Sequence, residues 1–199
     1  MTGSTPTVSE LLVEYDRARA FTDDLWRDLS PDEVVWRPNE QSSAIGWHLG
    51  HQAHVAHFMI RNLTAAEPSP DPELDDLMDS AQPETFRGAL PTVERLSLFR
   101  DTVADRVHAR LGDIAGRRVD SPDQMTVVGT HLLTALINHE YQHDQWIGEV
   151  RSRDLGTRYP TTPPRTPSAG SMATSCSTSL AESGHPTSRS QGHEDERRR

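Results

Sequence analysis

The sequence feature that most constrains the fold is a stretch from residue 125 to residue 150, in which two histidines interrupt an apolar face. His139 and His143 lie four residues apart, at positions where a core helix would ordinarily carry Leu or Ile. The apolar residues around them recur at the spacing of one helical face: Val128, Leu132, Ala135, Leu136, Ile147 and Val150. A helix of this kind packs its apolar face against other elements, and it would carry both imidazoles into that contact.

Two imidazoles on one helical face have the reach to bind a single metal ion. The alternative is a pair of buried histidines, each satisfied by a hydrogen bond to a neighbouring group. Burying two imidazoles without partners is costly, so one of these two arrangements is expected. Residues 125–150 alone leave both open.

Capping signals and apolar periodicity predict an all-α protein. Long helices are expected over about residues 8–29, from Ser42 or Ser43 to about Leu63, from Pro91 to about Gly112, and over 125–150. A short helix is expected after Ser30, with proline at its first position. Four amphipathic helices with long crossover connections indicate a four-helix bundle.

The chain divides into a bundle over residues 1–156 and a tail over residues 157–199. The tail is rich in Ser, Thr and Pro and poor in large apolar residues, so it is expected to be disordered. Within the bundle, residues 64–90 carry many acidic side chains among several prolines. They are expected to form a solvated crossover that contains one helical turn around Leu74 to Met78.

The helix expected over residues 42–63 carries four histidines at steps of three. Because such a step loses about 60° per repeat, the four cannot share one face. His48 and His51 are expected to face the core with Trp47, whereas His54 and His57 are expected to be solvated on the opposite side. A bundle core with three protein ligands and one open position would have the arrangement of a catalytic metal site.

Composition excludes several classes of function. The net charge is −10, and the periodic region has no basic cluster, which argues against nucleic-acid binding. All basic side chains are arginine, so a lysine Schiff base is excluded, and the single Cys176 leaves no intrachain disulfide. No apolar run is long enough to cross a membrane, and there is no signal-peptide core. We expect a soluble cytoplasmic protein, with a homodimer as an open alternative.

Two segments carry a family resemblance. SSAIGWHLGHQAHV, followed about 85 residues later by NHEYQHDQW, resembles the DinB-like superfamily of metal-binding four-helix bundles. It is similar in particular to the DinB-type amino-terminal domain of ergothioneine sulfoxide synthases and to DinB-like thiol S-transferases. The resemblance implies a divalent metal held by His51, His139 and His143. It also implies a low-molecular-weight thiol, such as mycothiol or bacillithiol, together with an electrophile as reaction partners. The large carboxy-terminal domain with which sulfoxide synthases bind substrate is not found in this chain.

The segment HEYQH also satisfies the HExxH pattern of zinc metalloproteases, with Glu140 as general base. No edge strand for a peptide is predicted, which disfavours that interpretation. The favoured function is a metal-dependent transferase or isomerase that uses a thiol; the alternative is a noncatalytic metal-binding or stress-response bundle. Three imidazoles suit Zn, Ni, Fe, Co or Mn. Glu140 and His48 are the candidate catalytic residues, and Glu140 and Asp144 are expected to accept hydrogen bonds from the ligand rings.

Overall fold

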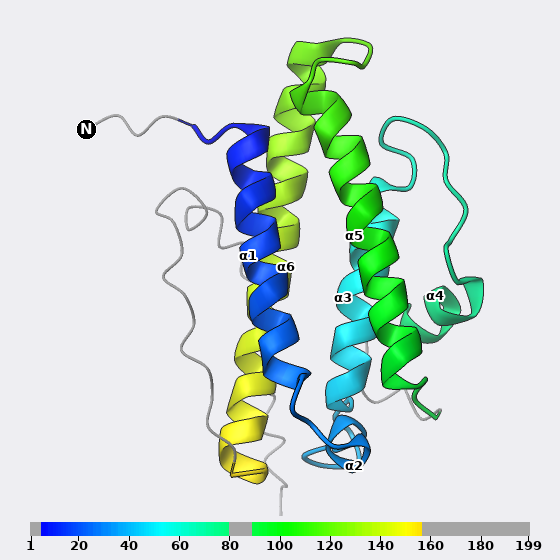
Figure 1. Cartoon of the computed structure of the whole chain (residues 1–199), viewed down its shortest axis with the longest axis vertical. Coiled ribbons are helices and arrows are strands. Elements are labelled where there is room, and N and C mark those ends of the chain that lie inside the picture. Colours follow the sequence, from blue (N-terminus) through cyan, green and yellow to red (C-terminus); the bar gives the residue numbers. More distant parts are fainter. Residues whose placement is uncertain (1–4, 80–88, 157–199) are drawn as a thin grey trace, which may run out of the picture.

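The computed structural model describes residues 5–79 and 89–156, and within these residues the regular structure is entirely helical. The described helices are α1 (Val8–Trp26), α2 (Pro31–Val34), α3 (Ile45–Ile60), α4 (Pro72–Met78), α5 (Val93–Ala115) and α6 (Pro122–Asp154). The predicted all-α class is confirmed, and the four long helices α1, α3, α5 and α6 form the bundle (Figure 1). The predicted tail, residues 157–199, lies outside the described residues.

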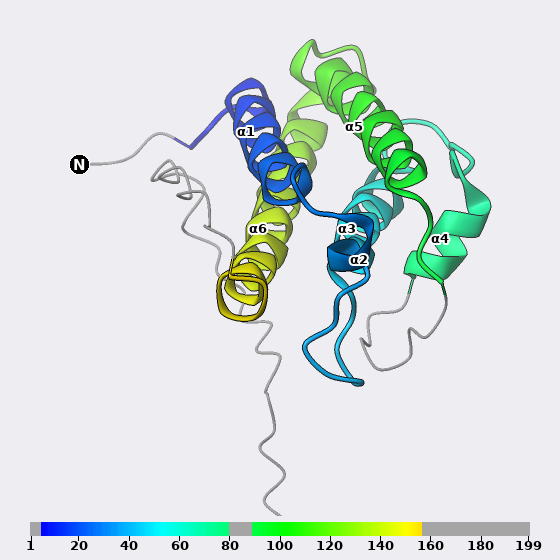
Figure 2. The same ribbon diagram turned by 60° about the horizontal axis from the view of Figure 1, so that its bottom comes forward.

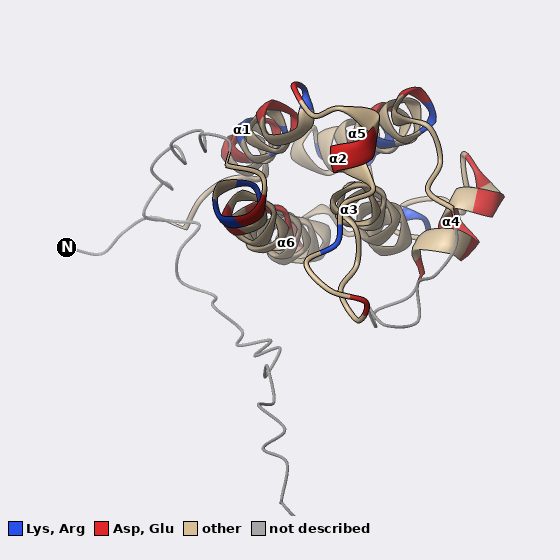
Figure 3. Ribbon diagram, turned by 90° about the horizontal axis from the view of Figure 1, so that it is seen from below, with Lys and Arg blue, Asp and Glu red and all other residues tan. Residues whose placement is uncertain are grey.

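The four long helices surround a common core. Figure 1 shows α3 and α5 running in the same direction, because the crossover that contains α4 returns the chain to the end where α3 begins. The tilted view in Figure 2 and the view from below in Figure 3 show α1 beside α6 and α3 beside α5. Fully buried side chains from all four helices fill the centre, among them Leu25, Leu49, Leu111 and Ile137. None of the described helices is both long enough and apolar enough to cross a lipid bilayer.

Several helix starts follow the capping chemistry of the sequence, whereas the N-caps of α3 and α6 make no side-chain hydrogen bond. Thr7 caps α1 and Ser30 caps α2, and each forms a capping box with the glutamate three residues later. The predicted serine cap of α3 is wrong, because Ala44 occupies the N-cap position without a side-chain hydrogen bond. The prediction that α5 begins at Pro91 is also wrong, because Thr92 is the N-cap and α5 begins at Val93.

The acidic crossover folds against the bundle, and this overturns the prediction that His54 and His57 are solvated. The two histidines are only 9% and 2% exposed, because α4 covers their side of α3. Asp75 of α4 lies 3.1 Å from His54 Nδ1 and 3.7 Å from His57 Nε2. Leu74 and Met78 of α4 are completely buried. The predicted helical turn is therefore confirmed, but it is a packed element rather than part of a solvated loop.

A buried polar network joins all four long helices near the middle of the bundle. Arg100 of α5, 2% exposed, donates to the carbonyl of Leu49 and to Gln52 Oε1, both at 3.2 Å, and lies 3.8 Å from Glu140 Oε2. The hydroxyl of Thr22 on α1 lies 2.8 Å from Glu140 Oε2, and it lies 2.7 Å from Asp144 Oδ1. Burial, together with the neighbouring Glu140, raises the pKa of Asp144 well above its ordinary value.

We predict that Arg100→Leu destabilises the fold by about 3–5 kcal/mol, because it leaves the charge of Glu140 buried without its cationic neighbour. The measurement is urea unfolding followed by circular dichroism. Arg117→Ala is the matched control. Arg117 pairs with Asp123 on the surface, with exposed fractions of 59% and 89%, so its loss should cost less than about 1 kcal/mol. Equal free energies of unfolding for the two variants would contradict the prediction.

Candidate metal centre

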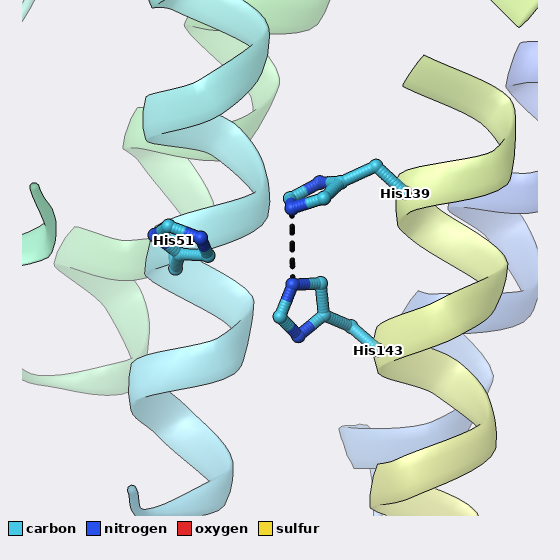
Figure 4. A group of neighbouring side chains, drawn as sticks. All are labelled: His51, His139 and His143. Atoms are coloured by element: carbon cyan, nitrogen blue, oxygen red, sulfur yellow. Dashed lines mark hydrogen bonds between the residues drawn. The ribbon is translucent and has the colours of Figure 1, made fainter. Parts of the chain in front are cut away.

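Three histidine rings from α3 and α6 converge in the space between these two helices. His51 approaches from α3, whereas His139 and His143 approach from consecutive turns of α6 (Figure 4). The Nε2 atoms of His139 and His143 are 3.0 Å apart. The centroid of the His51 ring lies 5.4 Å from that of His139 and 5.3 Å from that of His143. One nitrogen from each ring can be chosen so that all three lie within 4.8 Å of one another.

The ring of His51 is held in one orientation by two contacts. Its Nδ1 lies 2.9 Å from the backbone carbonyl oxygen of Met78, at the end of α4. A carbonyl only accepts hydrogen bonds, so Nδ1 carries the proton and Nε2 keeps its lone pair. The indole of Trp47 stacks on the ring at a centroid distance of 4.5 Å. A metal-binding histidine typically has this arrangement, with one nitrogen free and the other donating to an acceptor.

Gly50 makes room for the residue that holds His51. A Cβ atom at position 50 would lie 2.6 Å from both Cε and Sδ of Met78, which is closer than such atoms normally approach. Met78 therefore packs directly against the backbone of α3, one residue before His51. The missing side chain at position 50 lets the carbonyl of Met78 reach the His51 ring.

His48 lies behind the His143 ring, on the side away from His139. Its Nδ1 is 2.7 Å from His143 Nδ1, and its ring is 3.9 Å from that of Trp146, centroid to centroid. Its side chain is buried, with 6% exposed. The sequence predicted that His48 faces the core and named it as a candidate catalytic residue. The structure places His48 in contact with His143, a predicted ligand. The contact is made to Nδ1 of His143, the nitrogen that does not face His139.

Burial keeps the imidazoles of the site neutral. It lowers the pKa of both His48 and His139 to about 3 and that of His143 well below its ordinary value; in each case neighbouring imidazoles add to the effect. The pKa of His51 is also lowered, chiefly by burial, although the Met78 carbonyl acts in the opposite direction. A neutral imidazole has one free lone pair, so the group is ready to bind a cation without first losing protons.

The three rings fit a metal ion. Zinc–nitrogen bonds of about 2.0–2.1 Å in a tetrahedral site place the ligand nitrogens about 3.4 Å apart. The observed separations, from 3.0 Å to at most 4.8 Å, are close to that value. His139 and His143 are partly rather than fully buried. Within the described residues, this is the group of His, Cys, Asp and Glu side chains that meets the geometric requirement for a metal site.

The carboxylates of α6 do not lie where the sequence suggested. Glu140 and Asp144 are 3% and 1% exposed and occupy the middle of the buried face of α6, near Thr22 and Arg100. The side chain of Glu140 therefore points toward α1 and α5, and the prediction that it accepts a hydrogen bond from a ligand ring is wrong. This orientation also argues against Glu140 as the general base of a metalloprotease.

The apolar face of α6 is rotated from its predicted position. Val128 is 45% exposed and Ala135 is also exposed, whereas Leu133, Ile137 and Tyr141 are buried. Glu140 and Asp144 therefore lie at the centre of the buried face of α6. His139 and His143, the proposed ligands, lie at the edge of that face. That edge faces α3, so the two imidazoles lie close to His51.

Three contributors to the site were missed by the sequence reasoning: the carbonyl of Met78, Gly50 and Gln52. A backbone carbonyl 27 residues from its partner has no signal in a single sequence. The glycine before His51 was a usable signal, because a glycine within a helix often marks a close approach of another element. Gln52 Nε2 donates to the carbonyl of Glu140 at 3.2 Å and so joins α3 to α6.

The chain is an all-α bundle in which three converging histidines from α3 and α6 could hold a metal ion. A family model described as the DinB superfamily matches residues 14–147, which include His51, His139 and His143. The match extends over well more than half of the chain, and the protein belongs to the DinB superfamily. A search of curated proteins found no significant match.

We predict that His51→Ala, His139→Ala or His143→Ala abolishes stoichiometric binding of zinc or cobalt, because two imidazoles hold a divalent ion much less tightly than three. Elemental analysis of protein purified without a histidine tag measures this. His131→Ala is the control, because His131 is exposed on the same helix and its Nδ1 bonds to the Val127 carbonyl. Full metal content in any of the three ligand variants would remove that residue from the site.

We also predict that Gly50→Ala is about 1–3 kcal/mol less stable than Gly112→Ala, because only the first added methyl group collides with Met78. Gly112 lies in the last turns of α5, and a Cβ there would meet nothing within 4 Å. Both variants gain the same helix propensity, so their difference isolates the collision. Thermal unfolding of the two variants is the measurement. Equal stability would show that Met78 moves aside without cost.

Proposed function

We propose that this DinB-superfamily protein holds a divalent metal ion with His51, His139 and His143 and transfers a low-molecular-weight thiol to an electrophile. The observation that carries the proposal is the convergence of three neutral imidazoles, one of which is oriented by the Met78 carbonyl with Nε2 free. The metal is Zn, Ni, Fe, Co or Mn, since imidazole ligands suit all of these ions.

Three protein ligands support a catalytic site rather than a closed structural one. Structural zinc sites usually have four protein ligands, whereas catalytic sites keep one position for water or substrate. Glu140, the nearest carboxylate in sequence to His139, is engaged with Thr22 and lies near Arg100. His48 is bonded to the far nitrogen of His143, so it does not compete for the same space.

A bound divalent metal supplies Lewis acidity, which lowers the pKa of a thiol and yields a thiolate near neutral pH. The side chains of the protein supply position and surroundings. His51, His139 and His143 would fix where the ion is held, Trp47 stacks on the ring of His51, and Trp146 packs against the ring of His48 behind His143. In the transfer itself, the thiol proton passes to solvent, a sulfur–carbon bond forms, and the leaving group departs with the bonding electron pair.

We predict that the cobalt-loaded protein, titrated with mycothiol, bacillithiol or glutathione, gains a near-ultraviolet sulfur-to-cobalt charge-transfer band for at least one thiol. We expect the band because a thiolate that binds cobalt at a free coordination position gives a sulfur-to-metal charge transfer. The S-methylated form of the same thiol is the matched ligand control and should give no such band. His131→Ala should respond like the wild type.

A noncatalytic site that joins α3 to α6 would give a different result. The wild type would bind cobalt with full stoichiometry, yet no thiol would change its spectrum. That outcome would refute the transferase proposal and leave a metal-stabilised bundle. Absence of cobalt binding by the wild type would refute the metal site as well.

A further inference from the structure

His48 makes a contact that the three-ligand site does not itself require. Its Nδ1 lies 2.7 Å from Nδ1 of His143, and its ring is enclosed by Trp47 and Trp146, with only 6% of the residue exposed. Its Nε2 is completely buried and has no hydrogen-bond partner within the described part of the chain. Packing alone would favour an apolar residue at this position, because a buried ring nitrogen without a partner is unfavourable.

The proton positions around His143 follow from the geometry. A neutral imidazole carries one proton, on either Nδ1 or Nε2. Nε2 of His143 faces Nε2 of His139 at 3.0 Å, so Nε2 is the atom that would bind the ion. The proton of His143 must then lie on Nδ1, and the atom placed to accept it is Nδ1 of His48.

We propose that His48 is a positioning residue, which accepts the Nδ1 proton of His143 and so directs the Nε2 lone pair of His143 toward the metal. This inference rests on the proposed metal site. His48 then carries its own proton on Nε2, the buried nitrogen without a partner. It is not a fourth ligand, because the nitrogen that faces the site is already bonded to His143. The Met78 carbonyl has the same role for His51, with a backbone group in place of a side chain.

His51 is therefore oriented by a residue that follows it in the chain, and His143 by a residue that precedes it. His51 is oriented by α4, and His143 is oriented by α3, through the residue one turn before His51. Partners of this kind fix both the rotation of a ligand ring and its tautomer, and removing one typically lowers metal affinity about 10–100-fold. We expect His48 to have an effect of that size.

The test compares His48→Leu with His48→Asn in the full-length protein. Leu and Asn have nearly the same shape, so both leave a similar space beside Trp146, but only Asn has an oxygen close to where His48 Nδ1 lies. We expect His48→Leu to bind zinc about 10–100-fold more weakly than the wild type and His48→Asn to recover most of that loss. Competition with a chromophoric chelator gives the affinities, and unfolding curves of the metal-free variants show whether both fold equally well.

Nitrogen-15 NMR of the histidine rings in the zinc-loaded proteins provides the second readout. The wild type and His48→Asn should show His143 protonated at Nδ1 with a slowly exchanging proton, and His48→Leu should lose that slow exchange. If His48 only filled space, the His143 Nδ1 proton would exchange at the same rate in His48→Leu and His48→Asn, because the two side chains have nearly the same shape.

The outcomes separate the two proposals. If the wild type binds zinc but His48→Leu and His48→Asn bind it equally well, the positioning role is wrong and the metal site stands. If both variants lose zinc completely, His48 is itself a ligand, and the positioning role is again wrong. If the wild type binds no zinc, the metal site fails, and the role of His48 toward it fails with it.

Discussion

The geometry of the candidate metal centre depends on a hydrogen bond made one residue away from His51 and His139, two of its proposed ligands. Gln52 follows His51 on α3, and its amide donates to the carbonyl of Glu140, which follows His139 on α6, at 3.2 Å. Arg100 donates to the oxygen of the same amide at 3.2 Å, which fixes its orientation. A slip of α6 by one residue would move its histidines by about 1.5 Å along the axis. Such a slip would separate the rings, and the Gln52 bond opposes it.

The buried face of α6 keeps the acidic side chains next to His139 and His143 away from the candidate metal centre. Glu140 and Asp144 face the centre of the bundle, where Thr22 contacts both and Arg100 lies near Glu140. His139 and His143 lie about 100° further around the helix, toward α3. One helix thus carries two polar sets with separate roles. The carboxylates help to bind α6 to α1 and α5, and the imidazoles remain available.

The fold class and the pairing of His139 with His143 could be predicted from the sequence because both depend on periodicity. Periodicity left His48 and His51 open as the third histidine, and the family resemblance implied His51. The spacing of His139 and His143 requires a shared helical side whatever they pack against. The rotation of α6 could not be predicted, because a single sequence gives no sign that Arg100 would make Glu140 and Asp144 acceptable in the core. The burial of His57 was missed for a related reason. Acidic residues among prolines indicate a solvated loop, and only the packing of Leu74 and Met78 shows otherwise.

The Met78 carbonyl gives the site a tolerance to mutation that His48 does not share. Because the group that orients His51 belongs to the backbone, every amino acid at position 78 would supply it, provided that α4 keeps its place against Gly50. Evolution can therefore vary the surface of the crossover widely while the orientation of His51 is retained. The partner of His143 is a side chain, so a single substitution can remove it. Random mutation of this chain would therefore remove the group that orients His143 more readily than the group that orients His51.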